Sequence, residues 1–93
     1  MKVLSQDEIK RKLGTLHGWK ITPKDIRKRY ELGSFMSVIG LVIRVAEAAE
    51  KANHHPDMLI NYDKVTFTLI THDAGGITQK DFDLASRIDL LAA

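Results

Sequence analysis

The chain has 93 residues, of which 44% are hydrophobic and 28% charged, and its formal net charge at pH 7 is +2. This length predicts one small domain over residues 1–93, which oligomerisation would help to stabilise. The net charge is too small to indicate a nucleic-acid partner, and no apolar run is long enough to cross a membrane. The chain has no cysteine, which excludes disulfides and thiolate metal sites and fits a reducing compartment. We therefore expect a cytoplasmic protein.

The N-terminal third of the chain predicts a short helix followed by two strands. Ser5 and Glu8 form a capping box at the start of the helix, and Gly14 suits its end. Residues 19–21 and 26–32 then alternate between apolar and polar side chains, as strands do. The sequence thus begins with a helix and a strand pair.

A long helix is predicted over residues 35–52, with Ser34 as its N-terminal cap. Its polar residues form one narrow stripe, and most of the others are apolar or small. A helix that covers one face of a sheet needs a single apolar face. We therefore expect one side of this helix to pack on the sheet and the other on a second copy of the chain. Ile39 and Val42 are the residues we expect at this homodimer or homotetramer contact.

The C-terminal part of the chain predicts two more strands and a last helix. The strands lie around residues 58–60 and 65–70, and a second capping box, Thr78 and Asp81, begins the helix. We interpret Asp81 mainly as this structural cap. The complete order, helix-strand-strand-helix-strand-strand-helix, predicts an α+β domain in which three helices cover one face of a four-stranded antiparallel sheet.

Two adjacent histidines stand where the long helix must stop. Asn53 suits the left-handed conformation that ends helices, and Pro56 cannot extend one. His54 and His55 therefore fall at a corner between a helix and a strand. Glu50 precedes His54 by four residues, so it would share a helical face with His54 if the helix reached that far.

A third histidine, His72, ends the next apolar run. Strict alternation would turn it away from the more apolar face, so it could project from the sheet, or the alternation could break at the strand end. Imidazole titrates near neutral pH, so a pocket with several histidines suits a reaction that protonates one atom and deprotonates another. A zinc site is the alternative. Neighbouring residues of an extended segment point in opposite directions, however, so His54 and His55 are poorly placed to share an ion. We expect no metal.

The second half of the chain contains the spacing Glu50-x3-His54-His55-Pro56-x5-Tyr62-x9-His72-x8-Asp81. This spacing resembles the motif of the pterin-4a-carbinolamine dehydratase family, and similar positions, among them Gly18-Trp19 and Leu84-Ala85-Ser86, extend over nearly the whole chain. The resemblance implies a lyase, 4a-hydroxytetrahydrobiopterin dehydratase, that acts in tetrahydropterin recycling. It would convert the 4a-hydroxytetrahydropterin to quinonoid dihydropterin and water without a cofactor.

The resemblance also implies a set of site residues. His54, His55 and His72 would be catalytic, with His54 and His72 as the acid/base pair and His55 mainly binding the pterin. Glu50 would orient His54. The residues implied to contact the substrate are Glu50, Asn53, His54, His55, Ile70, Thr71, His72 and Asp73.

Two other functions stay open at this point. Animal members of the family also act as dimerisation partners of a homeodomain transcription factor, so the chain could be a dimerisation or coactivator module. Its substrate could also be another pterin, for example one of molybdopterin-related metabolism. Two positions depart from the family pattern: Asn53 is an aspartate in some relatives, and Met58 replaces a common aromatic residue.

Overall fold

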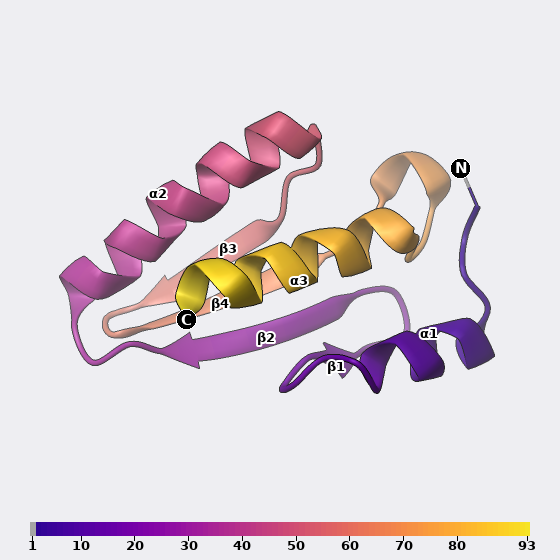
Figure 1. The fold of residues 1–93 in the computed structure, drawn as a ribbon, viewed down its shortest axis with the longest axis horizontal. Helices are drawn as coiled ribbons and strands as arrows, with labels where there is room; N and C mark the ends of the chain where they lie inside the picture. The colour runs from indigo at the N-terminus through magenta and orange to yellow at the C-terminus, as the bar shows by residue number, and fades with distance from the viewer. Residues whose placement is uncertain (1) are drawn as a thin grey trace.

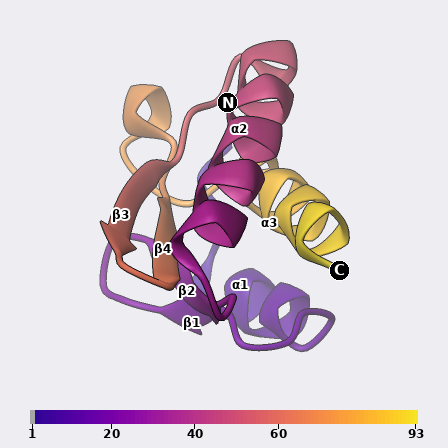
Figure 2. The same cartoon turned by 90° about the vertical axis from the view of Figure 1, so that its left-hand side faces the viewer.

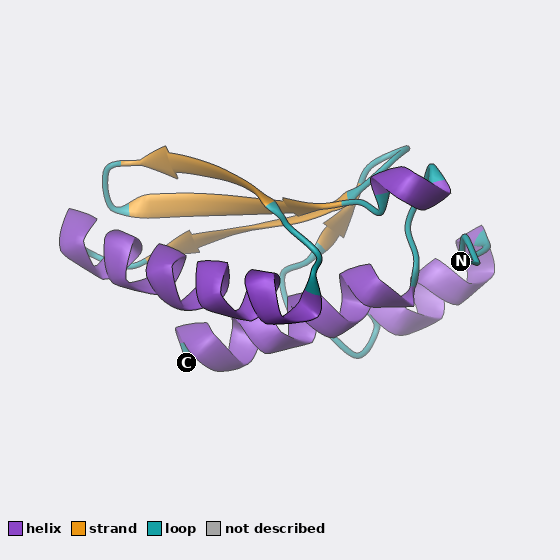
Figure 3. Ribbon diagram, turned by 90° about the horizontal axis from the view of Figure 1, so that it is seen from above, coloured by secondary structure: helices purple, strands orange, loops and turns teal. Residues whose placement is uncertain are grey.

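The computed structural model describes residues 2–93 and has the predicted order of helices and strands (Figure 1). Viewed from above, the helices lie on one side of the sheet, which confirms the predicted α+β fold (Figure 3). The elements are α1 (Gln6–Leu13), β1 (Lys20–Ile21), β2 (Ile26–Glu31), α2 (Phe35–Ala52), β3 (Asp57–Asn61), β4 (Lys64–Leu69), the 3₁₀ turn η1 (His72–Ala74) and α3 (Gln79–Ala92).

The four strands form one antiparallel sheet in the order β1-β2-β4-β3. Alternate residues of the central strand β4, Val65, Phe67 and Leu69, are fully buried, because successive side chains of a strand point to opposite faces. Phe67 packs against the ring of Tyr30 on β2 in an edge-on arrangement with ring centroids 5.9 Å apart. This face of the sheet is one wall of the hydrophobic core.

Helices α2 and α3 lie beside each other and supply the other wall (Figures 1 and 2). Residues at helical spacing on each helix turn towards the sheet and are buried. They are Val38, Leu41, Val45 and Ala49 of α2, and Phe82, Ala85 and Ile88 of α3. Removal of a side chain such as Phe82 from this core would destabilise the fold by about 3–5 kcal/mol.

The opposite side of α2 exposes large apolar side chains. Phe35, Met36 and Ile43 are 47%, 73% and 57% exposed, whereas Ile39 and Val42 are partly covered by the chain itself. The surplus of apolar residues expected from the sequence is therefore present, although the most exposed positions differ from those we predicted. The contact with a second copy stays a prediction.

The predicted caps are present, but the first strand is shorter than expected. Both capping boxes form, at Ser5 and at Thr78, whereas β1 comprises Lys20–Ile21 and leaves out Trp19. The buried Trp19 ring is turned to α3, where its Nε1–H donates to the carboxylate of Asp89 at 3.1 Å. Within residues 2–93, no helix has the length and apolarity needed to cross a membrane.

Candidate active site

The corner after α2 separates the two adjacent histidines. Asn53 takes the left-handed conformation, with φ 50° and ψ 43°, and its N–H donates to the last turn of the helix. His54 follows with a backbone N–H bond of 3.1 Å to Ala49. Beyond this turn the two imidazoles have different partners, since His54 contacts the carboxylate of Asp81 and His55 that of Glu50. His54 is buried, and His55 is exposed.

A compact loop after β4 brings the third histidine to the same place. Thr71 pairs with Gly76 in an isolated bridge, and the intervening residues form the 3₁₀ turn η1. Gly75 closes this turn with φ 76°, a conformation that side chains other than glycine's rarely adopt. His72 therefore begins a turn and does not end a strand, because β4 stops at Leu69. Of the two possibilities left open by the sequence, the alternation therefore breaks at the strand end, before His72.

These two segments enclose a pocket of about 290 Å³, close in size to the smaller ligand-binding pockets of proteins. Nearly all of the residues predicted to contact a substrate line it. The lining residues are Asn53, His54, His55, Ile70, Thr71, His72, Asp73 and Lys80. Glu50 was predicted but does not line the pocket. Lys80 lines it but was not predicted, since a lone lysine on a helix carries no sequence signal.

A buried carboxylate, that of Asp81, holds His54. Nε2 of His54 lies 2.6 Å from Oδ1 of Asp81, and the Asp81 side chain is fully buried. The other oxygen, Oδ2, accepts hydrogen bonds from the Thr71 hydroxyl and from the Thr78 backbone N–H, each at 2.9 Å. Because a carboxylate accepts and does not donate, Nε2 of His54 carries the proton in this contact.

This network leaves the other ring nitrogen of His54 free. Within residues 2–93, Nδ1 of His54 has no hydrogen-bond partner, and no buried side-chain nitrogen or oxygen is left unpaired. Nδ1 therefore keeps some exposure to solvent, and His54 lines the pocket. A neutral imidazole with its proton on Nε2 can accept a proton at Nδ1, and the carboxylate of Asp81 stabilises the cation that results.

Glu50 interacts with the other member of the histidine pair. Its carboxylate contacts Nε2 of His55 at the exposed edge of the corner. The prediction that Glu50 orients His54 was wrong, because α2 ends at Ala52 and the left-handed Asn53 turns His54 off the helical face of Glu50. Asp81, interpreted from the sequence mainly as a helix cap, both completes the cap with Thr78 and holds His54.

The histidines do not converge as metal ligands would. His54 and His55 have different carboxylate partners, on α3 and α2 respectively. Among the described residues, no group of three or more His, Cys, Asp or Glu side chains is placed to hold a metal ion. The arrangement instead offers imidazoles from two separate segments to one small pocket, where each could donate or accept a proton.

Comparison with known proteins gives a consistent family. Residues 2–91 match the family model described as pterin 4 alpha carbinolamine dehydratase. A protein of Roseiflexus sp. (strain RS-1), provisionally assigned as a pterin-4-alpha-carbinolamine dehydratase, is 56% identical over 92% of each chain. A protein of Cyanothece sp. (strain PCC 7425) with the same provisional assignment is 46% identical over 98% of this chain and 94% of its own.

Solved structures show the same fold. A structure described as a transcriptional coactivator/pterin dehydratase from Brucella melitensis has a TM-score of 0.95 and 29% identity, and the match covers 99% of this chain and all of that one. A second, described as a pterin dehydratase-like protein that is a RuBisCO assembly factor in the alpha-carboxysome, has a TM-score of 0.67. At 22% identity over 81% of this chain, the latter likeness concerns the fold alone.

Proposed function

Because this chain belongs to the pterin-4a-carbinolamine dehydratase family, we propose that it dehydrates a 4a-hydroxytetrahydropterin to the quinonoid dihydropterin and water. The observation that carries the proposal is the pocket lined by three histidines, one of them held by a buried carboxylate. The family resemblance and the pocket geometry support each other, since the three histidines of the motif line the pocket and Asp81 of the motif holds His54.

The reaction needs two proton transfers at neighbouring atoms of the ring. The C4a–O bond breaks and the hydroxyl leaves as water after it receives a proton. The N5–H bond also breaks, and its electron pair forms the C4a=N5 double bond. An acid near the hydroxyl and a base near N5 therefore accelerate the reaction.

We assign the base to His54 and the acid to His72. His54 has a free Nδ1 and a carboxylate behind Nε2, so it can accept the N5 proton and be stabilised as a cation. His72 lines the same pocket from η1, where its protonated form would deliver a proton to the leaving hydroxyl. His55, exposed and in contact with Glu50, would bind the ring edge.

Kinetics of single variants test this division of roles. His54→Ala and His72→Ala should each lower kcat by about a hundredfold or more. His55→Ala should mainly raise KM, because it removes binding common to the ground and transition states. Both stereoisomers at C4a should be assayed, since each presents its hydroxyl to a different face of the pocket. If His54→Ala keeps near wild-type kcat on both isomers, the assignment of the base is wrong.

We further propose that the exposed apolar side of α2 contacts a second copy of the chain, as a homodimer or homotetramer in the cytoplasm. The support is the exposure of Met36 and Ile43 on a helix whose other side is already packed. Ile43→Glu should dissociate the assembly, because it would bury an unpaired charge. Ser86→Glu, on the exposed face of α3, is the control. Light scattering that shows the wild type to be a monomer at micromolar concentration would refute the contact.

The Brucella melitensis relative is also described as a transcriptional coactivator, so a role as a dimerisation module is the second candidate. The same apolar side of α2 would then bind another protein. A histidine variant separates the two candidates: His54→Ala would abolish dehydration and leave binding through α2 unchanged.

A further inference from the structure

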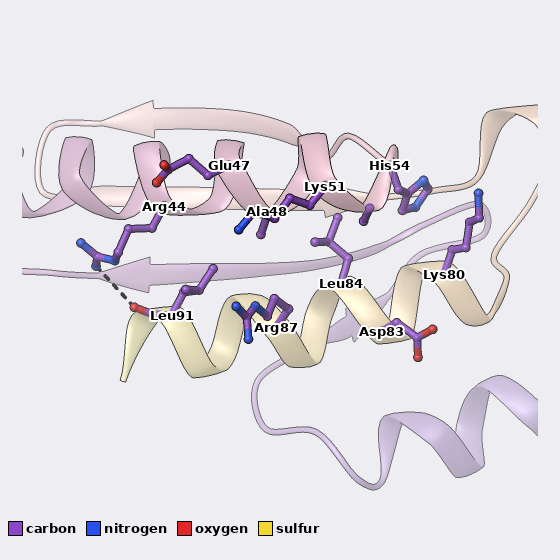
Figure 4. A pocket seen from close by; sticks show the side chains of 11 residues that line it. Arg44, Glu47, Ala48, Lys51, His54, Lys80, Asp83, Leu84, Arg87 and Leu91 are labelled. Atoms are coloured by element: carbon purple, nitrogen blue, oxygen red, sulfur yellow. Dashed lines mark hydrogen bonds between the residues drawn. The ribbon is translucent and has the colours of Figure 1, made fainter.

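A second, larger cavity adjoins the histidine pocket. It is a groove of about 660 Å³ between α2 and α3 (Figure 4). Ala48, Ala52, Leu84 and Leu91 form its apolar lining. His54 and Lys80 line both this groove and the histidine pocket. The two cavities therefore meet at His54 and Lys80, at one end of the groove.

The groove is positively charged. Two cations come from α2, Arg44 and Lys51, and two from α3, Lys80 and Arg87. In Figure 4, Lys80 lies at the end next to His54, and Lys51 and Arg87 reach the middle of the groove from opposite helices. The walls thus present basic groups along the whole path that leads away from the histidines.

The carboxylates of the groove do not neutralise these cations. The ion pairs found within residues 2–93 include none of the four, and the Arg44 guanidinium bonds to the carbonyl of Leu91 at 3.4 Å. Two carboxylates line the groove, those of Glu47 and Asp83, and neither takes part in an ion pair within residues 2–93. In Figure 4 the Glu47 carboxylate is directed away from α3, and that of Asp83, which accepts a bond from the Gln79 amide at 2.8 Å, is directed away from α2. Lys51 and Arg87 are therefore free to bind an anion.

We propose that this groove binds the anionic side chain of the substrate, so that the preferred substrate is a pterin whose C6 substituent carries a phosphate or a carboxylate. The inference rests on the proposed function. C6 is bonded to N5, so a ring that presents N5 to His54 starts its side chain beside one of the two residues that the cavities share. Apolar walls suit the carbon chain, and Lys51 and Arg87 suit a terminal anion.

The test compares pterins that share one ring and differ in the C6 side chain: a neutral dihydroxypropyl chain, its phosphomonoester, and a carboxylate-terminated chain. We expect the wild type to turn over the anionic substrates with a kcat/KM about tenfold higher, as two partly exposed charge contacts would give. The preference should shrink with added salt, because such contacts are screened. Comparison of kcat/KM for the phosphorylated and the carboxylate-terminated substrates identifies which anion the groove favours.

The double variant Lys51→Gln/Arg87→Gln should lose this preference and keep turnover of the neutral substrate. Lys24→Gln, at an exposed lysine in the turn before β2, is the matched control and should behave as the wild type. Equal kcat/KM for neutral and anionic substrates in the wild type would overturn the inference, as would a preference that survives in the double variant. Loss of the oligomer in the double variant without a change in preference would overturn it too, and would assign the groove to a contact between copies.

A binding measurement separates this inference from the proposed function. Stable 7,8-dihydropterins with neutral and phosphorylated side chains are titrated into the wild type and the double variant. If no carbinolamine is turned over, the proposed function fails, but tighter binding of the phosphorylated compound by the wild type, lost in the double variant, still supports the anion groove. Equal binding of both compounds overturns it.

Discussion

Replacement of Asp81 by asparagine probes the link between the buried network and the chemistry. The carboxylate accepts three hydrogen bonds, from His54, Thr71 and the Thr78 backbone. An asparagine offers one oxygen and one NH₂ group in the same shape. Since the Thr78 N–H can only donate, the oxygen is drawn to the Oδ2 position, and the NH₂ group then faces Nε2 of His54.

This exchange reverses the tautomer of His54. Facing a donor, Nε2 must give up its proton, so the neutral ring carries its proton on Nδ1, where the proposed base needs a lone pair. If the amide is flipped instead, the Thr78 N–H faces a donor inside the protein and is left unpaired, at a cost of about 1–3 kcal/mol. Either arrangement also replaces charged acceptors by neutral ones, which weakens each hydrogen bond by about 1 kcal/mol.

The expected result is a folded protein that is about 3 kcal/mol less stable and has lost most of its activity. The stability loss is smaller than the total stability of a typical domain, about 5–15 kcal/mol. The dehydration rate should fall by about 10²–10⁴-fold, as when a proton-transfer group is misplaced. Urea unfolding and stopped-flow absorbance of the carbinolamine measure the two quantities.

A buried aspartate outside the pocket serves as the control. Asp25 accepts bonds from Thr22 and Arg27 at the β1–β2 turn, and it is 5% exposed. Asp25→Asn should lower stability but leave turnover unchanged. The reasoning would be refuted if folded Asp81→Asn kept turnover within twofold of the wild type, or if the two variants lost activity equally.

Two further predictions concern stability and pH. Burial alone would raise the pKa of Asp25, but hydrogen bonds from Arg27 and Thr22 and the Arg27 charge together lower it. Ionised Asp25 therefore contributes to the free energy of unfolding above about pH 4, and this contribution is lost as the pH falls through the folded-state pKa. Chemical unfolding between pH 5 and 2 should therefore show a weaker pH dependence in Asp25→Asn than in the wild type. The pKa of Tyr30 is raised, first by burial and then by the hydrogen bond to Asp89 and the negative charge of Asp89. The wild type should therefore lose stability above about pH 10, where tyrosine in the unfolded chain ionises. Tyr30→Phe should reduce that alkaline loss, and an unchanged pH profile would contradict the burial of the hydroxyl.

Much of the fold follows from signals that are local in the sequence. The capping boxes at Ser5 and Thr78, the cap at Ser34 and the left-handed Asn53 set the helix ends at the predicted residues. The alternation of apolar and polar side chains predicts β4, and burial of one face fixes the register of this strand against its neighbours. These features depend on a few neighbouring residues, and tertiary packing reinforced them.

The site was predicted less completely, because its contacts cross the fold. Asp81 lies 27 residues after His54, and nothing in the local pattern joins them. Glu50 was assigned to His54 by helical spacing, which the turn at Asn53 interrupts. The resemblance to a family nevertheless located most of the pocket, because its motif collects residues that the fold brings together.

The most direct test of the account is the turnover of chemically prepared 4a-hydroxytetrahydropterin by the pure protein, with the uncatalysed dehydration subtracted. We predict that the wild type accelerates the loss of water for both stereoisomers, and that folded His54→Ala/His72→Ala does not accelerate either. A wild type no faster than buffer would contradict the proposed function. A double variant as active as the wild type would contradict the assignment of the chemistry to this pocket.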